Sequence, residues 1–305
     1  MFVTLENLTI RYGSITAVDQ ASAEFPSGAV GLLGRNGAGK SSILRALLGL
    51  VLPHAGEMKI LDFSPSDFEE SRRHIGYMSE KDGYIAGLNG FEMVALAGEI
   101  TGLPRRDAAR RAHEVLYLVG LEEQRYREIA GYSAGMRQKV KLGTALVHDP
   151  DILFLDEPTN GLDPKGRKEM LGLIDFLAKD LGKSIILSSH ILADVERVCH
   201  SVVLLEKGRV VAAGPLSELT RHEVRVFVVD IAGATTSPIE AFERHGALNI
   251  ELSGSDRYRV TLPEDVGASS LFAAAVDCGA MVHRLVEHKR SLEDVFLGAV
   301  KEGLA

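Results

Sequence analysis

Cysteine is scarce in this chain, which has two cysteines in 305 residues. Cys199 and Cys278 are far apart, and neither has a second cysteine at the short spacing of a zinc site. A disulfide-rich extracellular scaffold and a cysteine-based metal centre are therefore both disfavoured. We expect two free thiols in a reducing cytosol.

Long apolar runs are also missing. No stretch of about 18 uncharged apolar residues occurs, so we expect no segment to span a bilayer. The apolar run at residues 43–52 is short and contains Arg45, which is typical of a buried helix. The N-terminus lacks the basic-then-apolar pattern of a secretory signal. If the protein works at a membrane, another subunit must supply the spanning helices.

An excess of positive charge is absent as well. The 34 Lys and Arg residues against 42 Asp and Glu residues give a net charge of −8. This balance disfavours a general nucleic-acid-binding surface, and we predict no nucleic-acid partner. The hydrophobic share of 46% and the charged share of 25% are typical of a globular protein. The length allows one large core or two domains.

Most of the chain alternates between strand and helix patterns. Strands alternating with helices indicate an α/β fold with a mainly parallel sheet. Strands are predicted at residues 2–10, 29–33, 151–155 and 184–188, and helices at 41–50 and over much of 88–130.

The pattern changes near residue 217. From there the order is strand, helix, strand, strand, helix and strand, which predicts a small ferredoxin-like α+β domain at residues 217–305. A helix at residues 291–301 would close it. The other six elements are expected at residues 224–231, 237–244, 247–252, 257–262, 267–278 and 281–287.

A glycine-rich motif follows the strand predicted at residues 29–33. The sequence GRNGAGKS at residues 34–41, the phosphate loop, fits G-x-x-x-x-G-K-S between a strand and a helix. Glycines let the backbone approach phosphate, and the helix N-terminus favours an anion. Lys40 should reach the β- and γ-phosphates of a nucleoside triphosphate, and Ser41 should hold Mg²⁺. The expected nucleotide contacts here are Gly34, Arg35, Asn36, Gly37, Ala38, Gly39, Lys40, Ser41 and Ser42.

Two carboxylates end the strand predicted at residues 151–155. Asp156 and Glu157 are adjacent, and their mutual repulsion raises one pKa unless a cation or hydrogen bonds compensate. We expect Asp156 to hold Mg²⁺ and Glu157 to orient or deprotonate an attacking water. A strand that simply runs into a polar loop is the plainer alternative.

With these two motifs in place, residues 1–216 resemble the ABC ATPase family. The signature segment, YSAGMRQ at residues 132–138, resembles the family's Leu-Ser-Gly-Gly-Gln. PTNGLD at residues 158–163 resembles the loop after the catalytic glutamate. Ser188-Ser189-His190 is similar to the strand end that carries the switch histidine, and Tyr12 matches the aromatic that stacks on adenine.

The resemblance implies a P-loop ABC ATPase core with a helical subdomain at about residues 81–145, and two ATPase domains packed head to tail. Ser133 and the Gly135 backbone N–H would contact the γ-phosphate held by the partner copy. His190 would contact the γ-phosphate and help hold Glu157, and Asp163 would face the partner. The site would be complete only in a closed dimer. Ser133 as a plain helix cap and His190 as a satisfied polar residue remain alternatives.

The chain departs from the family pattern at three positions. Glu80 stands where the family usually has a glutamine that approaches magnesium, and a carboxylate could still ligate the ion. Ala134 adds one methyl to the signature, and Met136 removes a hydrogen-bonding side chain.

These variations, with SLEDVF at residues 291–296, resemble the ATPases of type-2 ABC exporters. The implied function is ATP hydrolysis that powers substrate movement through separate integral membrane permease subunits. The expected location is cytoplasmic, peripheral on the inner face of the cell membrane. Tyr84, Leu88, Phe91 and Met93 would line the groove for the membrane subunit, with ordinary core packing as the alternative.

Two other functions remain open at this point. A soluble ABC ATPase acting on ribosomes or DNA usually carries two cassettes or a long coiled coil, and this chain has one set of motifs and no heptad array. A kinase or GTPase with a phosphate loop would leave the signature segment and His190 unexplained.

Overall fold

The computed structural model describes residues 1–61, 63, 68–220, 224–254, 256–288 and 291–302. The chain divides into two compact units, one of Met1–Leu216 with Phe296–Ala305 and one of Ser217–Val295. The predicted accessory domain at residues 217–305 was therefore wrong at its C-terminal end. Phe296 belongs to the first unit because its side chain lines a cavity there.

The centre of the first unit is a six-stranded sheet in the order β5-β6-β7-β3-β8-β9. Neighbouring strands are parallel except for the β8–β9 pair, which is antiparallel. The mainly parallel sheet predicted from the sequence is thus confirmed. The strands are β3 (Ala29–Gly34), β5 (Ile75–Met78), β6 (Ile152–Asp156), β7 (Ser184–Ser189), β8 (Ser201–Glu206) and β9 (Arg209–Pro215).

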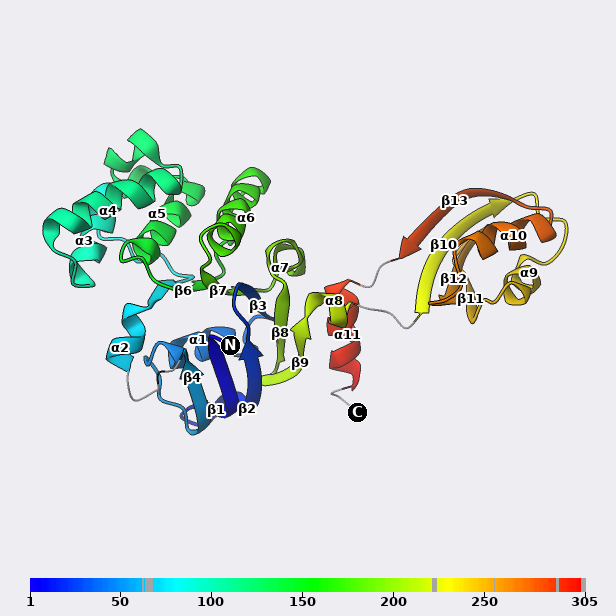
Figure 1. The fold of residues 1–305 in the computed structure, drawn as a ribbon, viewed down its shortest axis with the longest axis horizontal. Helices are drawn as coiled ribbons and strands as arrows, with labels where there is room; N and C mark the ends of the chain where they lie inside the picture. Colours follow the sequence, from blue (N-terminus) through cyan, green and yellow to red (C-terminus); the bar gives the residue numbers. More distant parts are fainter. Residues whose placement is uncertain (62, 64–67, 221–223, 255, 289–290, 303–305) are drawn as a thin grey trace. The chain divides into compact units, whose positions relative to one another are not determined.

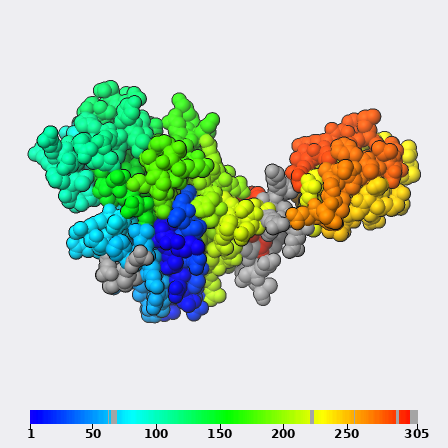
Figure 2. Space-filling view, viewed as in Figure 1, coloured from blue at the N-terminus to red at the C-terminus, as the bar shows by residue number. Residues whose placement is uncertain are grey.

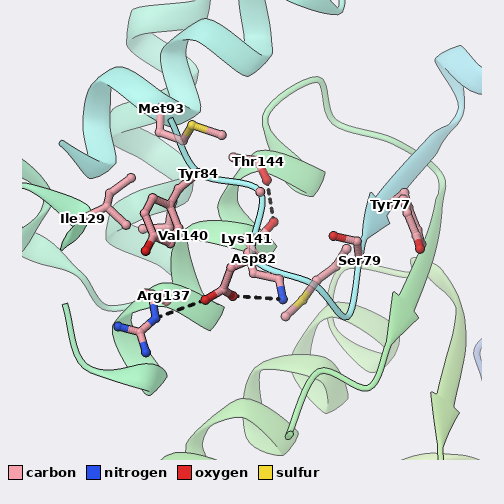
Figure 3. A pocket seen from close by; sticks show the side chains of 12 residues that line it. Tyr77, Ser79, Asp82, Tyr84, Met93, Ile129, Arg137, Val140, Lys141 and Thr144 are labelled. Atoms are coloured by element: carbon pink, nitrogen blue, oxygen red, sulfur yellow. Dashed lines mark hydrogen bonds and ion pairs between the residues drawn. The ribbon is translucent and has the colours of Figure 1, made fainter. Parts of the chain in front are cut away.

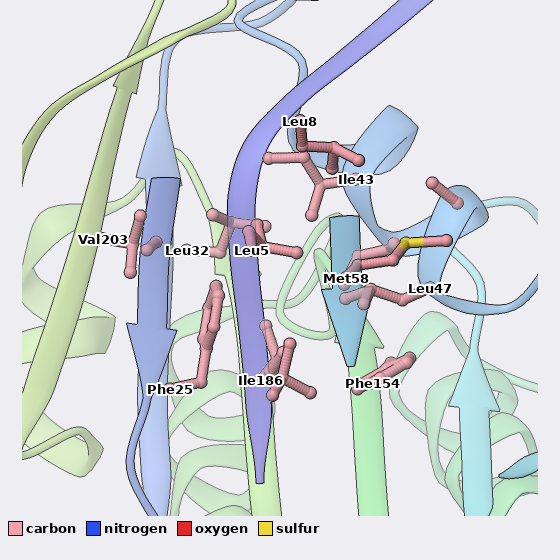
Figure 4. Close-up of a cluster of buried hydrophobic side chains, with 14 of the residues drawn as sticks. Leu5, Leu8, Phe25, Leu32, Ile43, Leu47, Met58, Phe154, Ile186 and Val203 are labelled. Carbon is pink, nitrogen blue, oxygen red and sulfur yellow. The ribbon is translucent and has the colours of Figure 1, made fainter. Parts of the chain in front are cut away.

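A second, antiparallel sheet covers this layer. It has the order β2-β1-β4, formed by β1 (Val3–Tyr12), β2 (Ile15–Phe25) and β4 (Ala55–Ile60). Between the two sheets lies the main apolar core, to which α1 (Lys40–Leu47) contributes Ile43 and Leu47 (Figure 4). Burial of these side chains from eight elements fixes the end of β3 relative to α1. Figure 4 also labels Leu5, Leu8, Phe25, Leu32, Met58, Phe154, Ile186 and Val203.

The segment between β5 and β6 is helical and forms a lobe of the first unit (Figures 1 and 2). Asn89 begins its first helix with a reciprocal capping box with Glu92, which satisfies two backbone N–H groups. The elements are α3 (Gly90–Ile100), α4 (Arg105–Leu118), α5 (Ala134–Leu146) and the short 3₁₀ turns η2 (Glu122–Tyr126) and η3 (Ile129–Gly131).

Four further helices connect the sheet strands. The longest, α6, begins with Asp163 as N-cap, whose side chain accepts from the Gly166 N–H, and with proline at its first turn. These helices are α2 (Phe68–Arg73), α6 (Pro164–Lys179), α7 (Leu192–Val198) and α8 (Leu216–Leu219).

The second unit is a four-stranded antiparallel sheet in the order β11-β12-β10-β13, with two helices on one face (Figure 1). Phe227, Val229 and Ile231 alternate toward those helices and form its core with Phe242 and Leu271. The predicted βαββαβ order and ferredoxin-like class are confirmed. The elements are β10 (Val224–Ala232), α9 (Pro238–Arg244), β11 (Asn249–Leu252), β12 (Arg257–Pro263), α10 (Ser269–Asp277) and β13 (Met281–His288), followed by α11 (Leu292–Glu302).

Within the described ranges, no helix has both the length and the apolar character needed to cross a membrane. Cys199 and Cys278 are buried free cysteines, one in each unit.

Candidate functional site

The phosphate loop joins the end of β3 to the start of α1. Gly39 precedes the helix with φ +109°, a backbone conformation that L side chains rarely adopt. A Cβ at this position would lie 2.6 Å from the Ala17 carbonyl oxygen, and one at Gly34 would lie 2.5 Å from the Leu205 carbonyl oxygen. Glycine is therefore required for the loop to pack against β2 and β8. No side chain caps α1, which leaves its N-terminus available to an anion.

This loop borders a cavity of about 500 Å³. Ten of the residues predicted from the sequence line it, and Ala17 of β2 is a lining residue that the sequence did not indicate. Tyr12 stands at the cavity with 40% of its surface exposed. The lining residues are Tyr12, Ala17, Asn36, Gly37, Ala38, Gly39, Lys40, Ser41, Ser42, Glu80 and Glu157.

Lys40 is buried in this cavity although it carries a charge. Its side chain is 6% exposed, and its Nζ donates to the Gly34 carbonyl oxygen at 2.7 Å. The same Nζ lies 3.4 Å from Glu157 Oε1. A buried ammonium needs such partners, and Glu157 supplies the opposite charge.

Glu157 follows the last residue of β6 and has a left-handed backbone with φ +51°. Such a backbone is strained for a residue with a Cβ and is held by surrounding contacts. Its N–H donates to the Ser188 carbonyl at 3.0 Å, and its Oε2 lies 2.8 Å from His190 Nδ1. The structure thus brings together a carboxylate, an imidazole and an ammonium at one end of the sheet, an arrangement that can orient a water beside a bound phosphate.

Asp156 ends β6 and is 3% exposed. Its Oδ1 atom is buried and has no hydrogen-bond partner among the described residues. Burial, and after it the charge of Asp156, raises the pKa of Tyr77 to about 12. A buried carboxylate oxygen without a partner is a costly feature, which a bound cation would relieve.

Four of the predicted residues line a second cavity, of about 230 Å³. They are Gly34, Arg35, Asn36 and His190, and Phe296 of α11 lines the same cavity. The SLEDVF segment at residues 291–296 thus reaches this cavity through Phe296. The sequence had indicated no neighbour for this segment. The full lining is Leu33, Gly34, Arg35, Asn36, His190, Leu192 and Phe296.

The signature segment lies apart from the phosphate loop within this chain. Ser133 is the N-cap of α5, and its side chain accepts from the Met136 N–H at 3.3 Å. It therefore has at least the helix-capping role that was the alternative to a nucleotide contact. Ser133, Gly135 and Asp163 line a third cavity, of about 480 Å³, that shares no residue with the nucleotide cavity. One copy therefore does not bring all the predicted nucleotide contacts together.

A fourth cavity, of about 100 Å³, lies between the end of β5 and the helical lobe (Figure 3). Tyr84 and Met93 line it, together with Ile129 and Val140. The docking groove predicted from the sequence stays a prediction. Leu88 is not among the residues that line this cavity, and the Phe91 ring lies tilted against His113 with ring centroids 4.4 Å apart.

Ion pairs tie the loop after Glu80 to α5 at this cavity. Asp82 Oδ2 lies 3.4 Å from Arg137 Nε, and Asp82 Oδ1 lies 3.7 Å from Lys141 Nζ (Figure 3). Lys141 also donates to the Glu80 carbonyl oxygen at 2.8 Å. Burial lowers the pKa of Lys141, and Asp82 opposes that shift. The sequence analysis missed Asp82 and Lys141, because they pair across 59 positions and belong to no short motif.

The sequence of this chain is similar to those of known proteins. The profile of the family described as "ABC transporter" matches residues 18–160. The chain is 33% identical over 300 residues to the uncharacterized ABC transporter ATP-binding protein YxlF of Bacillus subtilis (strain 168), covering 98% of this chain and 99% of that protein. It is 33% identical over 304 residues to the bacitracin transport ATP-binding protein BcrA of Bacillus licheniformis, covering 97% and 96%.

Solved structures show the same fold over most of the chain. An ATP-binding subunit of an ABC transporter is 32% identical with a TM-score of 0.64, covering 72% of this chain and 92% of that one. A dimeric post-hydrolysis state of the ATP-binding cassette MJ0796, bound to ADP and Pi, is 25% identical with a TM-score of 0.64, covering 70% and 98%.

Proposed function

Because this chain belongs to the family of ABC transporter ATP-binding proteins, we propose that it hydrolyses ATP with magnesium in a two-copy assembly and so drives a separate membrane permease. The observation that carries this proposal is the cavity that the phosphate loop shares with Glu80 and Glu157, with His190 bonded to Glu157. A phosphate-binding loop facing a carboxylate–imidazole pair suits hydrolysis better than binding alone.

The nucleotide would lie along the phosphate loop. The uncapped N-terminus of α1 and the loop backbone favour the phosphate charge, and Tyr12 at the cavity edge offers an aromatic face to adenine. A triphosphate would compete with Glu157 for the ammonium of Lys40, which lies 3.4 Å from that carboxylate. ATP binding would therefore release the Glu157 carboxylate for its role in hydrolysis.

The residues present suit a magnesium ion. The unpartnered Asp156 oxygen is buried, and Ser41 and Glu80 line the nucleotide cavity. No three His, Cys, Asp or Glu side chains of the described segments could hold a metal by themselves. A site of few carboxylates completed by a hydroxyl and substrate phosphates is typical of magnesium, which neutralises phosphate charge when bound.

Glu157 and His190 would carry the hydrolytic step. The water oxygen attacks the γ-phosphorus, the bond from that phosphorus to the bridging oxygen breaks, and the water proton passes to Glu157. The 2.8 Å contact to His190 Nδ1 fixes the direction of the carboxylate. ADP and inorganic phosphate are the products.

A second copy would complete each site. Ser133 and Gly135 line a cavity separate from the nucleotide cavity, so they are free to serve another chain. The family's dimeric structures, including a cassette bound to ADP and Pi, support this assembly. Asp163 would then face the partner at the same interface.

The membrane partner would dock at the cavity between β5 and the helical lobe. Tyr84, Met93, Ile129 and Val140 offer an apolar lining beside the loop that follows Glu80. We propose that the chain lies at the cytoplasmic face of the membrane and supports export. The support for export is the 30% identity to a Nod factor export ATP-binding protein.

Replacement of the proposed base tests this function. Glu157→Gln should keep ATP binding and lower steady-state hydrolysis by about 10²–10⁴-fold, because a positioned base or water-orienting group contributes that much. The measurements are phosphate release and ATP affinity for the purified protein. Glu123→Gln, at an exposed acid on η2, is the matched control. Hydrolysis by Glu157→Gln at the parental rate would show that the base is misassigned.

A further inference from the structure

Asp194 on α7 is a buried carboxylate outside every motif considered so far. It is 2% exposed and lies four residues after His190. Its Oδ2 accepts from Thr159 Oγ1 at 2.6 Å, and its Oδ1 accepts from Arg167 Nε at 2.5 Å. A buried charge is tolerated where it is paired and hydrogen-bonded, and both Asp194 oxygens meet that condition.

Each partner of Asp194 lies beside a residue of the proposed site. Thr159 is two residues after Glu157 and is itself 3% exposed. Arg167 lies in the first turn of α6, the helix whose N-cap is Asp163. One carboxylate thus joins the helix that follows His190 to the 157–163 loop and to the helix that follows that loop.

Helix α5 also contacts this loop. Gln138 of α5 donates from Nε2 to the Asn160 carbonyl at 3.2 Å. Within the loop, the Asn160 N–H donates to the Glu157 carbonyl at 3.1 Å. The left-handed backbone of Glu157, φ +51°, depends on such outside contacts, because its own conformation is strained.

We infer that Asp194 is a positioning residue for hydrolysis. Through Thr159 it fixes the loop that carries Glu157, and through its own helix it fixes that loop relative to His190. Through Arg167 it holds the helix start at Asp163, where the second copy would dock. This inference rests on the proposed role of Glu157. Asp194 itself does not line the nucleotide cavity, so its effect on ATP affinity is small.

The sharpest test replaces Thr159 with valine or with serine. The two replacements separate the effect of its shape from the effect of its hydroxyl group. Thr159→Val keeps the volume but removes the donor to Asp194, and Thr159→Ser keeps the donor. We expect Thr159→Val to lower kcat by about 10-fold or more, because small misplacements of a reacting group are costly. Thr159→Ser should retain most of the parental kcat. ATP affinity should change less than about threefold in both.

Asp194→Asn provides the second variant and should lower kcat in the same direction, because the amide loses the charge that faces Arg167. Asp180→Asn, at an exposed acid ending α6, is its matched control and should match the parent. If Asp194→Asn fails to fold, the Thr159 pair still decides the question. Melting temperatures measured for all variants would identify a general loss of stability.

A double-mutant cycle separates positioning of Glu157 from a general structural role. In the Glu157→Gln background, Thr159→Val should no longer lower the single-turnover rate, because there is no base left to position. A loss by the same factor in both backgrounds would overturn the inference, as would a parental kcat for Thr159→Val. A parental rate for Glu157→Gln alone would instead show that the base is misassigned, which is the proposed role on which this inference rests.

Discussion

Glu80 stands at the position where the resemblance to ABC ATPases led us to expect glutamine. Its side chain lines the nucleotide cavity, and its carbonyl oxygen accepts from Lys141 Nζ. Of the described residues that line this cavity, Glu80 and Glu157 are acidic and Lys40 is basic. The two carboxylates offset part of the attraction that Lys40 and the α1 N-terminus exert on a polyphosphate arriving without a cation. Magnesium should therefore matter more here than in a site with glutamine at residue 80.

Glu80→Gln should tighten the binding of magnesium-free ATP by about three- to tenfold, because one negative charge facing the phosphates is removed. With magnesium present, the affinity for ATP should change less. The substitution then removes the attraction between the carboxylate and the ion as well as the repulsion between the carboxylate and the phosphates. Titration of ATP in the presence and absence of a chelator measures both constants. Glu123→Gln is the control, and weaker binding of magnesium-free ATP by Glu80→Gln would contradict the argument.

Site residues that belong to a short sequence motif could be predicted from the sequence. Residues whose partners lie far away along the chain could not. The phosphate loop is recognisable because glycines, Lys40 and Ser41 must lie at fixed spacing to surround phosphate. Asp194 meets Thr159 across 35 positions and Asp82 meets Lys141 across 59, so no local pattern marks either pair. Only the packing of the sheet brings them together.

Among the elements, the helical lobe offers the clearest test of partner binding. Met93 of α3 lines the cavity beside Tyr84, whereas Ile100 of the same helix is 76% exposed and lines none of the cavities described above. An aspartate at residue 93 would place a charge in an apolar lining. The two positions therefore form a matched pair on one helix.

Met93→Asp should abolish co-purification with the membrane permease subunit, while Ile100→Asp should retain it. The measurement is a pull-down from detergent-solubilised membranes in which both subunits are expressed. ATP binding by the isolated chain should be unchanged in both variants, because neither residue lines the nucleotide cavity. Undiminished capture of the permease by Met93→Asp would argue against the groove.

Helices and strands could be predicted where the apolar pattern of the segment alone indicates its structure. Strand β3 and the βαββαβ order of the second unit follow from runs of apolar residues that each bury one or both faces. Strands β2, β4, β5, β8 and β9 were missed. The patterns of β2, β4 and β9 are partly exposed, and antiparallel pairing decides them. Strands β5 and β8 are short buried runs that only their parallel pairing in the sheet identifies. The apolar pattern around Phe91 does not reveal which neighbour the ring meets, here His113.

At the scale of the whole molecule, the second unit is an insertion in the sequence. Residues of the first unit precede it and, from Phe296 on, follow it. Order along the chain alone predicts that the whole last helix belongs to the second unit, whereas from Phe296 on the helix belongs to the first. The contact of Phe296 with the cavity beside Arg35 and His190 is a tertiary one that this order cannot reveal.

The proposed division of each ATP site between two copies has a consequence that mixing two variants can test. Lys40→Ala should lose phosphate binding, and Ser133→Arg should block closure of the dimer on the partner's nucleotide. Each variant alone should be inactive. A mixed dimer, however, pairs the intact phosphate loop of the Ser133→Arg chain with the intact signature segment of the Lys40→Ala chain, which gives one complete site.

An equal mixture should therefore recover about a quarter of the parental hydrolysis, because half of the dimers are mixed and each mixed dimer has one working site of two. Phosphate release after subunit exchange measures the recovery, and it should rise with total protein concentration since association is required. Ser133→Arg that hydrolyses ATP alone at the parental rate would show that each chain completes its own site. A mixture as inactive as its components would show that one complete site is not sufficient or that the copies do not pair in this manner.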